Sequence, residues 1–403
     1  MKDQFVVPAK LKTTSFVLMG IGVLTLLIGL VAMGGEHASG RFWGGILQNS
    51  SFFLLSALAG GTFFIAATTL AHGGWQIAFR RVPEAISMAV PVLGGVLFVV
   101  LMILLFGEKE QVYHWASPEV VKHDAILQGK SAFLGKPFFT IATLITLGLW
   151  ILFTIRLRRM SLEEDTWDLS PESGRRILWR NTVWCGGFIV IYTLSVGSTT
   201  PWLWLMSVDP HWYSTLYSWY TFASTWETGL AIITLFVIYL KRNGYLSMVN
   251  EEHLHDLGKF IFAFSIFWTY LWFAQYMLTW YANIPEETVY FQPRVWGQFR
   301  PVFFLNLIVN FVLPILLLMK RDTKRNYTAV TYMALLTIFG HWLDFFQMIA
   351  PATSKDLHFP WYELGVGLGF AGLLIFVVAN QLSKASLVPR NHPYLKESIV
   401  HHT

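Results

Sequence analysis

Apolar residues fill ten long stretches of the chain, and polar or charged residues mark the ends of each stretch. A helix needs about 20 apolar residues to cross the roughly 30 Å hydrocarbon core of a bilayer, and every stretch comes close to that length. The stretches cover residues 15–34, 47–71, 84–106, 137–155, 182–206, 219–240, 256–282, 302–319, 327–349 and 362–382. The pattern therefore predicts an all-α polytopic membrane protein with about ten transmembrane helices.

The composition agrees with this prediction. Of the 403 residues, 54% are hydrophobic and 13% are charged, and the mean hydropathy is +0.50. The connections between the predicted spans are too short to hold a soluble catalytic domain, and the first stretch is a full-length span rather than a cleaved signal sequence. We therefore expect one integral membrane domain over residues 1–403, with any chemistry in or beside the bilayer.

Lysine and arginine are distributed unevenly between the two sides of the predicted membrane. The loops on the side of the N-terminus carry twenty of them, six between residues 156 and 180, whereas the opposite loops carry eight. Short cytoplasmic loops retain positive charge, so we expect both termini in the cytoplasm. The net charge of +5 follows from this loop bias and does not indicate nucleic-acid binding.

The chain has one cysteine, Cys185, in the apolar start of the fifth span. One thiol cannot form an internal disulfide, a cysteine-based zinc site or an iron–sulfur cluster, and the CxxCH signature of c-type haem attachment does not occur. If the protein takes part in electron transfer, a partner must hold the metals.

Ionisable residues inside the predicted spans are the candidates for function, because burying such groups in a bilayer is expensive. The segment TIFGHWLDFFQM holds His341 and Asp344, which share a helix face. At 1.5 Å per residue, His341 and Glu227 both lie about 12 Å below the outer edge, and Asp344 is about 4.5 Å shallower. Asn310 and Gln275 fall at similar depths. Histidine and buried carboxylates suit proton transfer, with a structural polar network as the alternative.

A second group of polar residues lies near the inner ends of the spans. It comprises His72, Glu84 and Asp256, with His253, His255 and Lys259 beside Asp256. We consider His72, Glu84 and Asp256 for proton uptake, although residues at helix ends can also reach water or headgroups. A b-type haem is disfavoured, because His72 and His341 lie roughly 20 Å apart along the membrane normal and cannot share one iron.

The segment HDLGKFIFAFSIFWTYLWFAQYMLTWYANIPEETVYF, residues 255–291, resembles the ActF-type membrane subunits of bacterial alternative complex III. These are similar to the polysulfide reductase (NrfD-like) membrane-subunit family. The resemblance implies two four-helix bundles, residues 47–206 and 219–349, flanked by helices 15–34 and 362–382, in the bacterial inner membrane. It also implies a quinol-oxidising complex with a sister membrane subunit (ActC), an iron–sulfur subunit, c-type cytochrome subunits and lipids, which passes electrons to cytochrome c, a cupredoxin or a terminal oxidase.

Within such a complex, we expect this chain to supply a proton path through spans six to nine. Menaquinol, iron–sulfur clusters and haem c belong to the complex, and we assign no catalytic residue or metal ligand to this chain. Whether the chain adds a quinone-binding surface is left open. The alternatives are an ion-coupled transporter, which inverted repeats and a broken helix would favour, and a purely structural membrane anchor.

Overall fold

The computed structural model describes residues 4–33, 39–168, 170–354 and 356–402. These ranges are almost entirely helical and contain no strand. Ten of their helices are long and apolar enough to cross a membrane. They are α1 (Ala9–Met33), α2–η1–α3 (Ser39–Leu70), α4–α5 (Arg81–Phe106), α8 (Lys136–Glu164), α9–η4–α10–η5 (Pro171–Val208), α11 (Leu216–Arg242), α12 (Glu251–Ala282), α14–η7–α15 (Arg300–Leu318), α17 (Tyr327–Thr353) and α18 (Trp361–Leu382). The prediction of an all-α, multi-pass membrane protein is confirmed.

Several helices extend well beyond the predicted apolar stretches. The second span begins at Ser39 instead of residue 47, the fifth begins at Pro171 instead of 182, and α8 ends at Glu164 instead of 155. Hydropathy detects only the apolar part of a helix, whereas charged residues such as Arg158 continue α8 because they have ion-pair partners.

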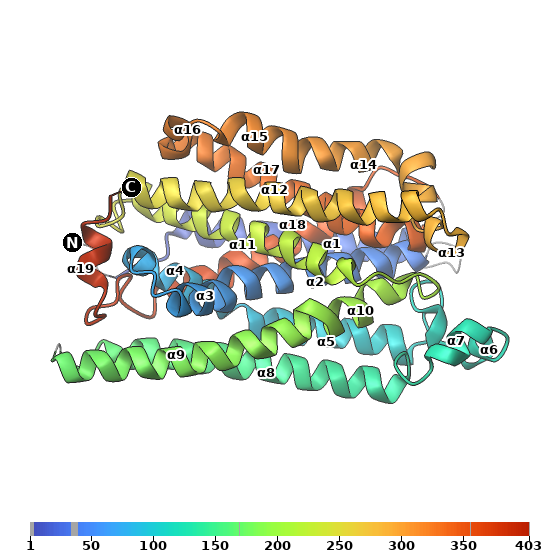
Figure 1. Ribbon diagram of the computed structural model, residues 1–403, viewed down its shortest axis with the longest axis horizontal. Coiled ribbons are helices and arrows are strands. Elements are labelled where there is room, and N and C mark those ends of the chain that lie inside the picture. The colour runs from blue at the N-terminus through green and yellow to red at the C-terminus, as the bar shows by residue number, and fades with distance from the viewer. Residues whose placement is uncertain (1–3, 34–38, 169, 355, 403) are drawn as a thin grey trace.

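Short helices lie between the long ones and after the last of them. They are η2 (Trp75–Phe79), η3 (His114–Ala116), α6 (Pro118–Lys122), α7 (Ala125–Lys130), α13 (Pro285–Thr288), η6 (Gln292–Trp296), α16 (Arg321–Arg325) and α19 (Leu395–Ile399). Figure 1 shows α6 and α7 at one end of the molecule and α19 at the other.

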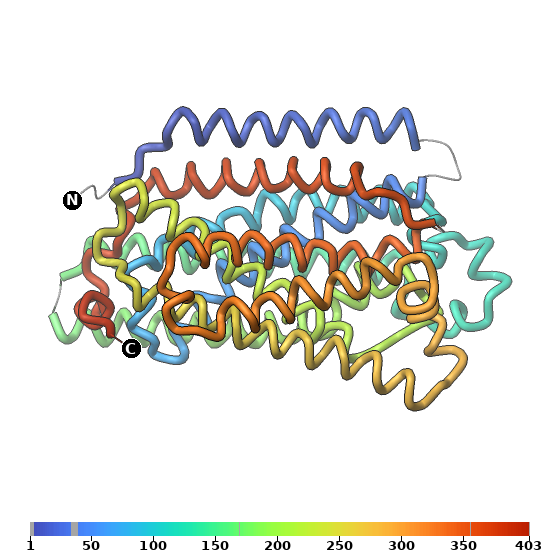
Figure 2. The backbone as a smooth tube through the Cα atoms, turned by 90° about the horizontal axis from the view of Figure 1, so that it is seen from above, coloured from blue at the N-terminus to red at the C-terminus, as the bar shows by residue number. Residues whose placement is uncertain are grey.

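The long helices contact one another in two rings of four. In the first ring α2 contacts α5, α5 contacts α8, α8 contacts α9, and α9 returns to α3. In the second ring α11 contacts α12, α12 contacts α15, α14 contacts α17, and α17 returns to α11. Helices α11 and α17 also contact α2 and so join the rings, while α18 packs on α2 and carries α1 on its other side (Figure 2).

Glycine allows the two rings to approach closely. A Cβ atom on Gly229 of α11 would lie 2.4 Å from the backbone nitrogen of Gly60 in η1, closer than real Cβ contacts. Close backbone approach through small residues is the usual way that membrane helices pack. This contact fixes α11 against the first ring two residues from Glu227.

Three of the long spans contain a π-helical turn, at Ala59–Phe63, Ser195–Thr199 and Ile308–Val312. Such turns add a residue to one helical turn, rotate the side chains that follow, and often occur at functional sites. The helices continue on both sides of each turn, so these spans are widened rather than broken.

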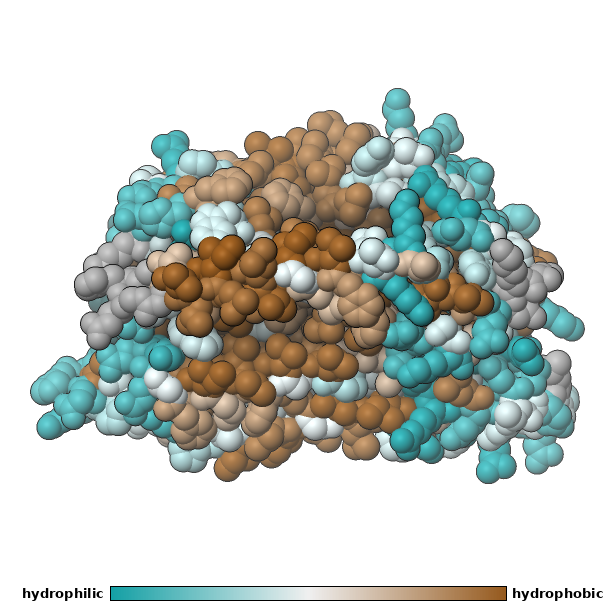
Figure 3. Space-filling model, turned by 180° about the vertical axis from the view of Figure 1, so that it is seen from behind, coloured by the Kyte–Doolittle hydropathy of each residue, from teal (hydrophilic) through white to brown (hydrophobic). Residues whose placement is uncertain are grey.

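Both ends of the described chain lie at the same end of the molecule (Figure 1). Gln4 pairs with Ser386 through the backbone, and its side-chain amide donates to the carbonyl oxygen of Ser383 at 3.1 Å. Between this end and the opposite one, hydrophobic residues form a broad band across the face drawn in Figure 3, with hydrophilic residues at both ends. This is the surface expected of a protein that crosses a bilayer.

Candidate functional site

Glu227 and His341 meet between α11 and α17, and both side chains are 0% exposed. Nε2 of His341 lies 3.1 Å from Oε2 of Glu227. The pair is at ion-pair distance but off the angle of a hydrogen bond, so within the described ranges neither oxygen of Glu227 accepts a hydrogen bond. Nδ1 of His341 lies 3.2 Å from the hydroxyl of Ser224, one turn along α11. The two predicted residues are therefore in direct contact.

Asp344 is also fully buried, but it has a complete set of donors. The hydroxyl of Tyr220 donates to its Oδ1, Nδ2 of Asn306 donates to the same oxygen at 2.9 Å, and Nε1 of Trp268 donates to Oδ2 at 2.9 Å. These donors come from α11, α14 and α12, so Asp344 ties three helices to α17. We call Glu227, His341 and Asp344 with these partners the outer cluster.

Asn310 joins the outer cluster through Asn306. Its Nδ2 donates to Oδ1 of Asn306 at 2.6 Å, and its own Oδ1 has no partner among the described residues. A Cβ atom at Gly340 would lie 1.9 Å from that oxygen. Asn310 fits against α17 only because residue 340 is glycine.

Gln275 lies on α12 but outside the outer cluster. Its side chain is buried, and its Nε2 has no hydrogen-bond partner in the described part of the chain. Trp268, seven residues earlier and therefore about 10 Å further inward along the helix, is the α12 residue that reaches Asp344. Depth counting placed Gln275 near the level of the outer cluster, whereas the α12 residue that contacts Asp344 is Trp268.

The partners of the outer cluster were missed by sequence reasoning. Tyr220, Ser224, Trp268 and Asn306 are uncharged and look like packing or interfacial residues. One signal was available, because Tyr220, Ser224 and Glu227 are spaced i, i+4, i+7 and so share one face of α11.

A buried arginine lies at the outer end of the second ring, beyond Asp344. Arg294 of η6 is 3% exposed, and its guanidinium donates to the carbonyl oxygens of Gln347 at 3.0 Å and Met348 at 3.3 Å. It also lies 3.5 Å from both the Tyr290 ring centroid and Oδ2 of Asp209. Burial raises the pKa of Tyr290 to about 12, opposed by Arg294 and reinforced by Asp209 and Asp344. The phenol therefore stays neutral at physiological pH.

Glu84 lies in an ion cluster at the inner end of the first ring. Its carboxylate accepts hydrogen bonds from Arg80 at 3.2 Å, Arg81 at 3.0 Å and Arg158 at 2.5 Å, and from the hydroxyl of Ser161 at 2.5 Å. Three guanidinium groups around one buried carboxylate stabilise its charged form. This geometry suits a structural anchor between α4 and α8 better than a proton carrier.

His72 lies beside a cavity that Arg80, one of the donors to Glu84, also lines. His72 follows α3 with a left-handed backbone (φ 52°) and an exposed side chain, at the rim of a small cavity lined also by Arg80, Asn181 and His392. Burial, with Arg80 nearby, lowers the pKa of His392 to about 3. His72 and Glu84 therefore have Arg80 as a common neighbour, whereas the partners of Asp256 lie elsewhere in the chain.

Asp256 pairs with residues from two parts of the chain. Nζ of Lys259 lies 2.6 Å from its Oδ1, and Nε2 of His401 lies 2.7 Å from its Oδ2. Lys259 was noted beside Asp256 in the sequence, but His401 is more than a hundred residues away, and no local pattern pointed to it.

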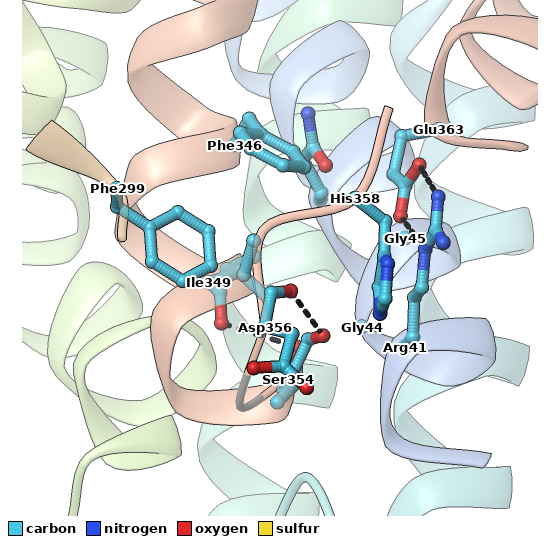
Figure 4. Close-up of a pocket in the computed structure, with 13 residues that line it drawn as sticks. Arg41, Gly44, Gly45, Phe299, Phe346, Ile349, Ser354, Asp356, His358 and Glu363 are labelled. Atoms are coloured by element: carbon cyan, nitrogen blue, oxygen red, sulfur yellow. Dashed lines mark hydrogen bonds and ion pairs between the residues drawn. The ribbon is translucent and has the colours of Figure 1, made fainter. Parts of the chain in front are cut away.

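A cavity opens at the outer end between α2, α17 and α18 (Figure 4). Arg41 makes two hydrogen bonds to the carboxylate of Glu363, at 2.8 and 3.0 Å, and Asp356 and His358 lie on the loop in front of this pair. The free volume of about 10 Å³ holds roughly one water molecule. As it stands, the cavity is too small for a quinone ring.

Within the described ranges, no group of three or more His, Cys, Asp and Glu side chains is arranged to hold a metal ion. Comparison of the sequence with protein-family models gives no match, and comparison with curated proteins gives none either.

Proposed function

We propose that this chain conducts protons through its second ring of helices, as a membrane subunit of a quinol-oxidising complex of the alternative complex III type. The support for a complex of that type is the resemblance of residues 255–291 to its membrane subunits. The support for proton conduction is the outer cluster, and above all the pair Glu227 and His341.

The Glu227–His341 pair has the chemistry that proton transfer requires. Two buried titratable groups at 3.1 Å can share one proton and exchange it without a large movement of side chains. Neither carboxylate oxygen of Glu227 accepts a hydrogen bond from the described residues. Each oxygen can therefore bind a water molecule or a proton. Intramembrane ionisable residues with such partners mark proton relays in many membrane proteins.

Asp344 fits the outer side of the same path. It lies one helical turn beyond His341, towards Arg294 and the partly exposed Asp209. Its three donors also suit a structural role, in which the carboxylate holds α11, α12 and α14 on α17. We therefore assign proton exchange first to Glu227 and His341, and treat Asp344 as the outer acceptor anchored by its neighbours.

Quinol oxidation and electron transfer are assigned to partner subunits. The cavity of Figure 4 holds about one water molecule, and the first ring offers mainly hydroxyl groups near its outer end. One of them, Ser195, already accepts from Nε1 of Trp150 at 2.9 Å. A sister subunit of the ActC type beside the iron–sulfur subunit is the better place for menaquinol, and haem c belongs to the cytochrome subunits.

The test compares Glu227→Gln with Glu286→Gln in the complex purified from native membrane and reconstituted in proteoliposomes. Glu286 is an exposed carboxylate on α13, so the control makes the same chemical change outside the cluster. We expect Glu227→Gln to slow proton release during quinol oxidation by about tenfold or more, the scale of losing a positioned acid–base group. The control should keep the parent rate.

Two outcomes would contradict the proposal at different levels. Unchanged proton stoichiometry and rate in an intact Glu227→Gln complex would leave only a structural role for the outer cluster. Purification of the chain as a solitary particle without haem or iron–sulfur absorbance would rule out the complex, and an ion-coupled transporter would then be the better function.

A further inference from the structure

The segment that follows α18 folds back over the inner end of the second ring. Its helix α19 packs against η2, and Ser398 is 0% exposed there. The hydroxyl of Ser398 donates to the carbonyl oxygen of Trp75 at 2.6 Å, accepts from the amide of Ala78 at 2.9 Å, and lies 3.3 Å from Nε2 of His253. Three contacts to one hydroxyl fix α19 in a single position.

This position brings His401 onto Asp256. Besides the 2.7 Å contact between Nε2 and Oδ2, the carbonyl oxygen of His401 accepts from Nδ2 of Asn250 at 3.1 Å. The His401 side chain is 16% exposed, whereas that of Asp256 is 8% exposed. His401 therefore lies between the inner water and the more deeply buried carboxylate.

An open hollow of about 790 Å³ lies at the inner surface beside His402, the residue that follows His401. Asn250, which holds the backbone of His401, lines it, and so does His402. Charged side chains, among them Lys241, Arg242 and Glu251, also line it. An open hollow of this size with charged walls is filled by water. This water brings protons as far as Asn250 and His402, next to His401.

We propose that His401 carries protons between this water and Asp256, and that α19 positions it for the purpose. The inference rests on the proposed function, of which it describes the inner side. In the forward step the imidazolium gives its Nε2 proton to Oδ2 of Asp256, which leaves a neutral imidazole and a carboxylic acid. The imidazole is then reprotonated by a hydronium ion from the hollow, which leaves a water molecule.

Charged and aromatic groups surround His401 and its acceptor Asp256. Nζ of Lys259 lies 2.6 Å and Nδ1 of His255 lies 3.9 Å from the other oxygen of Asp256. The single ammonium group of Lys259 favours the charged carboxylate, so Asp256 holds a transferred proton only briefly. The His253 ring is 5.2 Å away and the Trp75 ring 6.4 Å away, centroid to centroid. An imidazole can donate from one ring nitrogen while the other ring nitrogen accepts, which is the chemistry that a proton carrier needs.

The test measures proton uptake from the inner side in the reconstituted complex carrying His401→Gln. The amide of glutamine can still donate to Asp256, so the contact that holds the segment is retained. We expect uptake to slow about tenfold and added imidazole to restore much of the lost rate. The control is His123→Gln, the same change on an exposed histidine of the opposite surface, which should have no effect.

The outcomes separate this inference from the proposed function. Unchanged uptake in His401→Gln, or slow uptake that imidazole does not restore, would overturn the role of His401, because imidazole can replace a proton carrier but not a structural anchor. If Glu227→Gln abolishes proton transfer while His401→Gln behaves like the parent, only this inference fails. If both variants behave like the parent, the proposed function fails too.

Discussion

At the scale of single residues, Gly340 makes room for Asn310, whose side chain is hydrogen-bonded through Asn306 to Asp344. Its missing Cβ would lie 1.9 Å from Oδ1 of Asn310 and 2.7 Å from Cγ1 of Val309. We predict that Gly340→Ala forces α14–η7–α15 away from α17 and destabilises the protein by about 1–3 kcal/mol, the usual cost of overpacking. Thermal unfolding in detergent measures the effect.

The matched control for this substitution is Gly148→Ala on α8. No atom lies within 4 Å of a Cβ built at Gly148, and the residue is exposed on the outside of the helices. Alanine should be neutral or slightly stabilising there. Equal unfolding temperatures for the two variants would mean that Asn310 can move aside without cost.

The same residues show how far single positions could be predicted. Glu227, His341 and Asp344 stood out because charge inside an apolar stretch is rare, and depth counting placed them near one level. Their donors did not stand out, because depth fixes the height of a residue and not the direction in which it points. Tyr220 and Trp268 became identifiable only once α11, α12 and α17 had a defined rotation about their axes.

At the scale of elements, Arg294 and Pro351 form a coupled pair at the outer end of α17. Pro351 lies inside the helix and has no N–H to donate to the carbonyl oxygen of Gln347. Arg294 donates to that oxygen instead, at 3.0 Å. Arg294 therefore attaches the short helix η6 to α17 at the position where Pro351 removes one of the helix's own hydrogen bonds.

We predict that Arg294→Gln destabilises the protein by about 2–4 kcal/mol, because several buried acceptors lose their donor. Pro351→Ala should restore an N–H to Gln347 and reduce that cost by about 1 kcal/mol in the double variant. Unfolding free energies of the single and double variants give the coupling, and Arg300→Gln, an exposed arginine nearby, serves as control. Strictly additive effects would show that Arg294 does not replace the missing donor.

Helix boundaries were less predictable than helix existence for a related reason. The apolar stretches gave all ten long helices, because the bilayer requires an apolar surface over a fixed thickness. The polar extensions, such as Glu164 of α8 with its 2.7 Å bond from Asn181, depend on partners from other helices. The π-helical turns likewise had no sequence signal that hydropathy could detect.

At the scale of the whole molecule, the two rings meet beside the pair Glu227 and His341. Helices α11 and α17 carry Glu227 and His341 and also contact α2 of the first ring, so this pair lies where the two rings join. The C-terminal segment covers the inner end of the same ring. Contacts between residues more than a hundred positions apart, such as Asp256 with His401, depend on this packing and could not be predicted from local pattern.

The direction of the proposed proton path depends on which end of the molecule faces the cytoplasm. The loop between α8 and α9 and the termini lie at one end, and α6 and α7 lie at the other (Figure 1). Because arginine is concentrated at the first end, we predict that it is cytoplasmic. Lys122 and Arg175 are exposed at the two ends and can each be replaced by cysteine after Cys185→Ser removes the one native thiol.

A membrane-impermeant maleimide added to intact spheroplasts should label Lys122→Cys and leave Arg175→Cys unlabelled until the cells are lysed. The reason is energetic, since holding the arginine-rich loop on the cytoplasmic side avoids moving several guanidinium groups through the hydrocarbon core, at about 2.5–3.5 kcal/mol each. The reverse labelling pattern would show that the molecule has the opposite orientation in the membrane. His401 and Asp256 would then face the periplasm, and the outer cluster would take protons from the cytoplasm instead of releasing them.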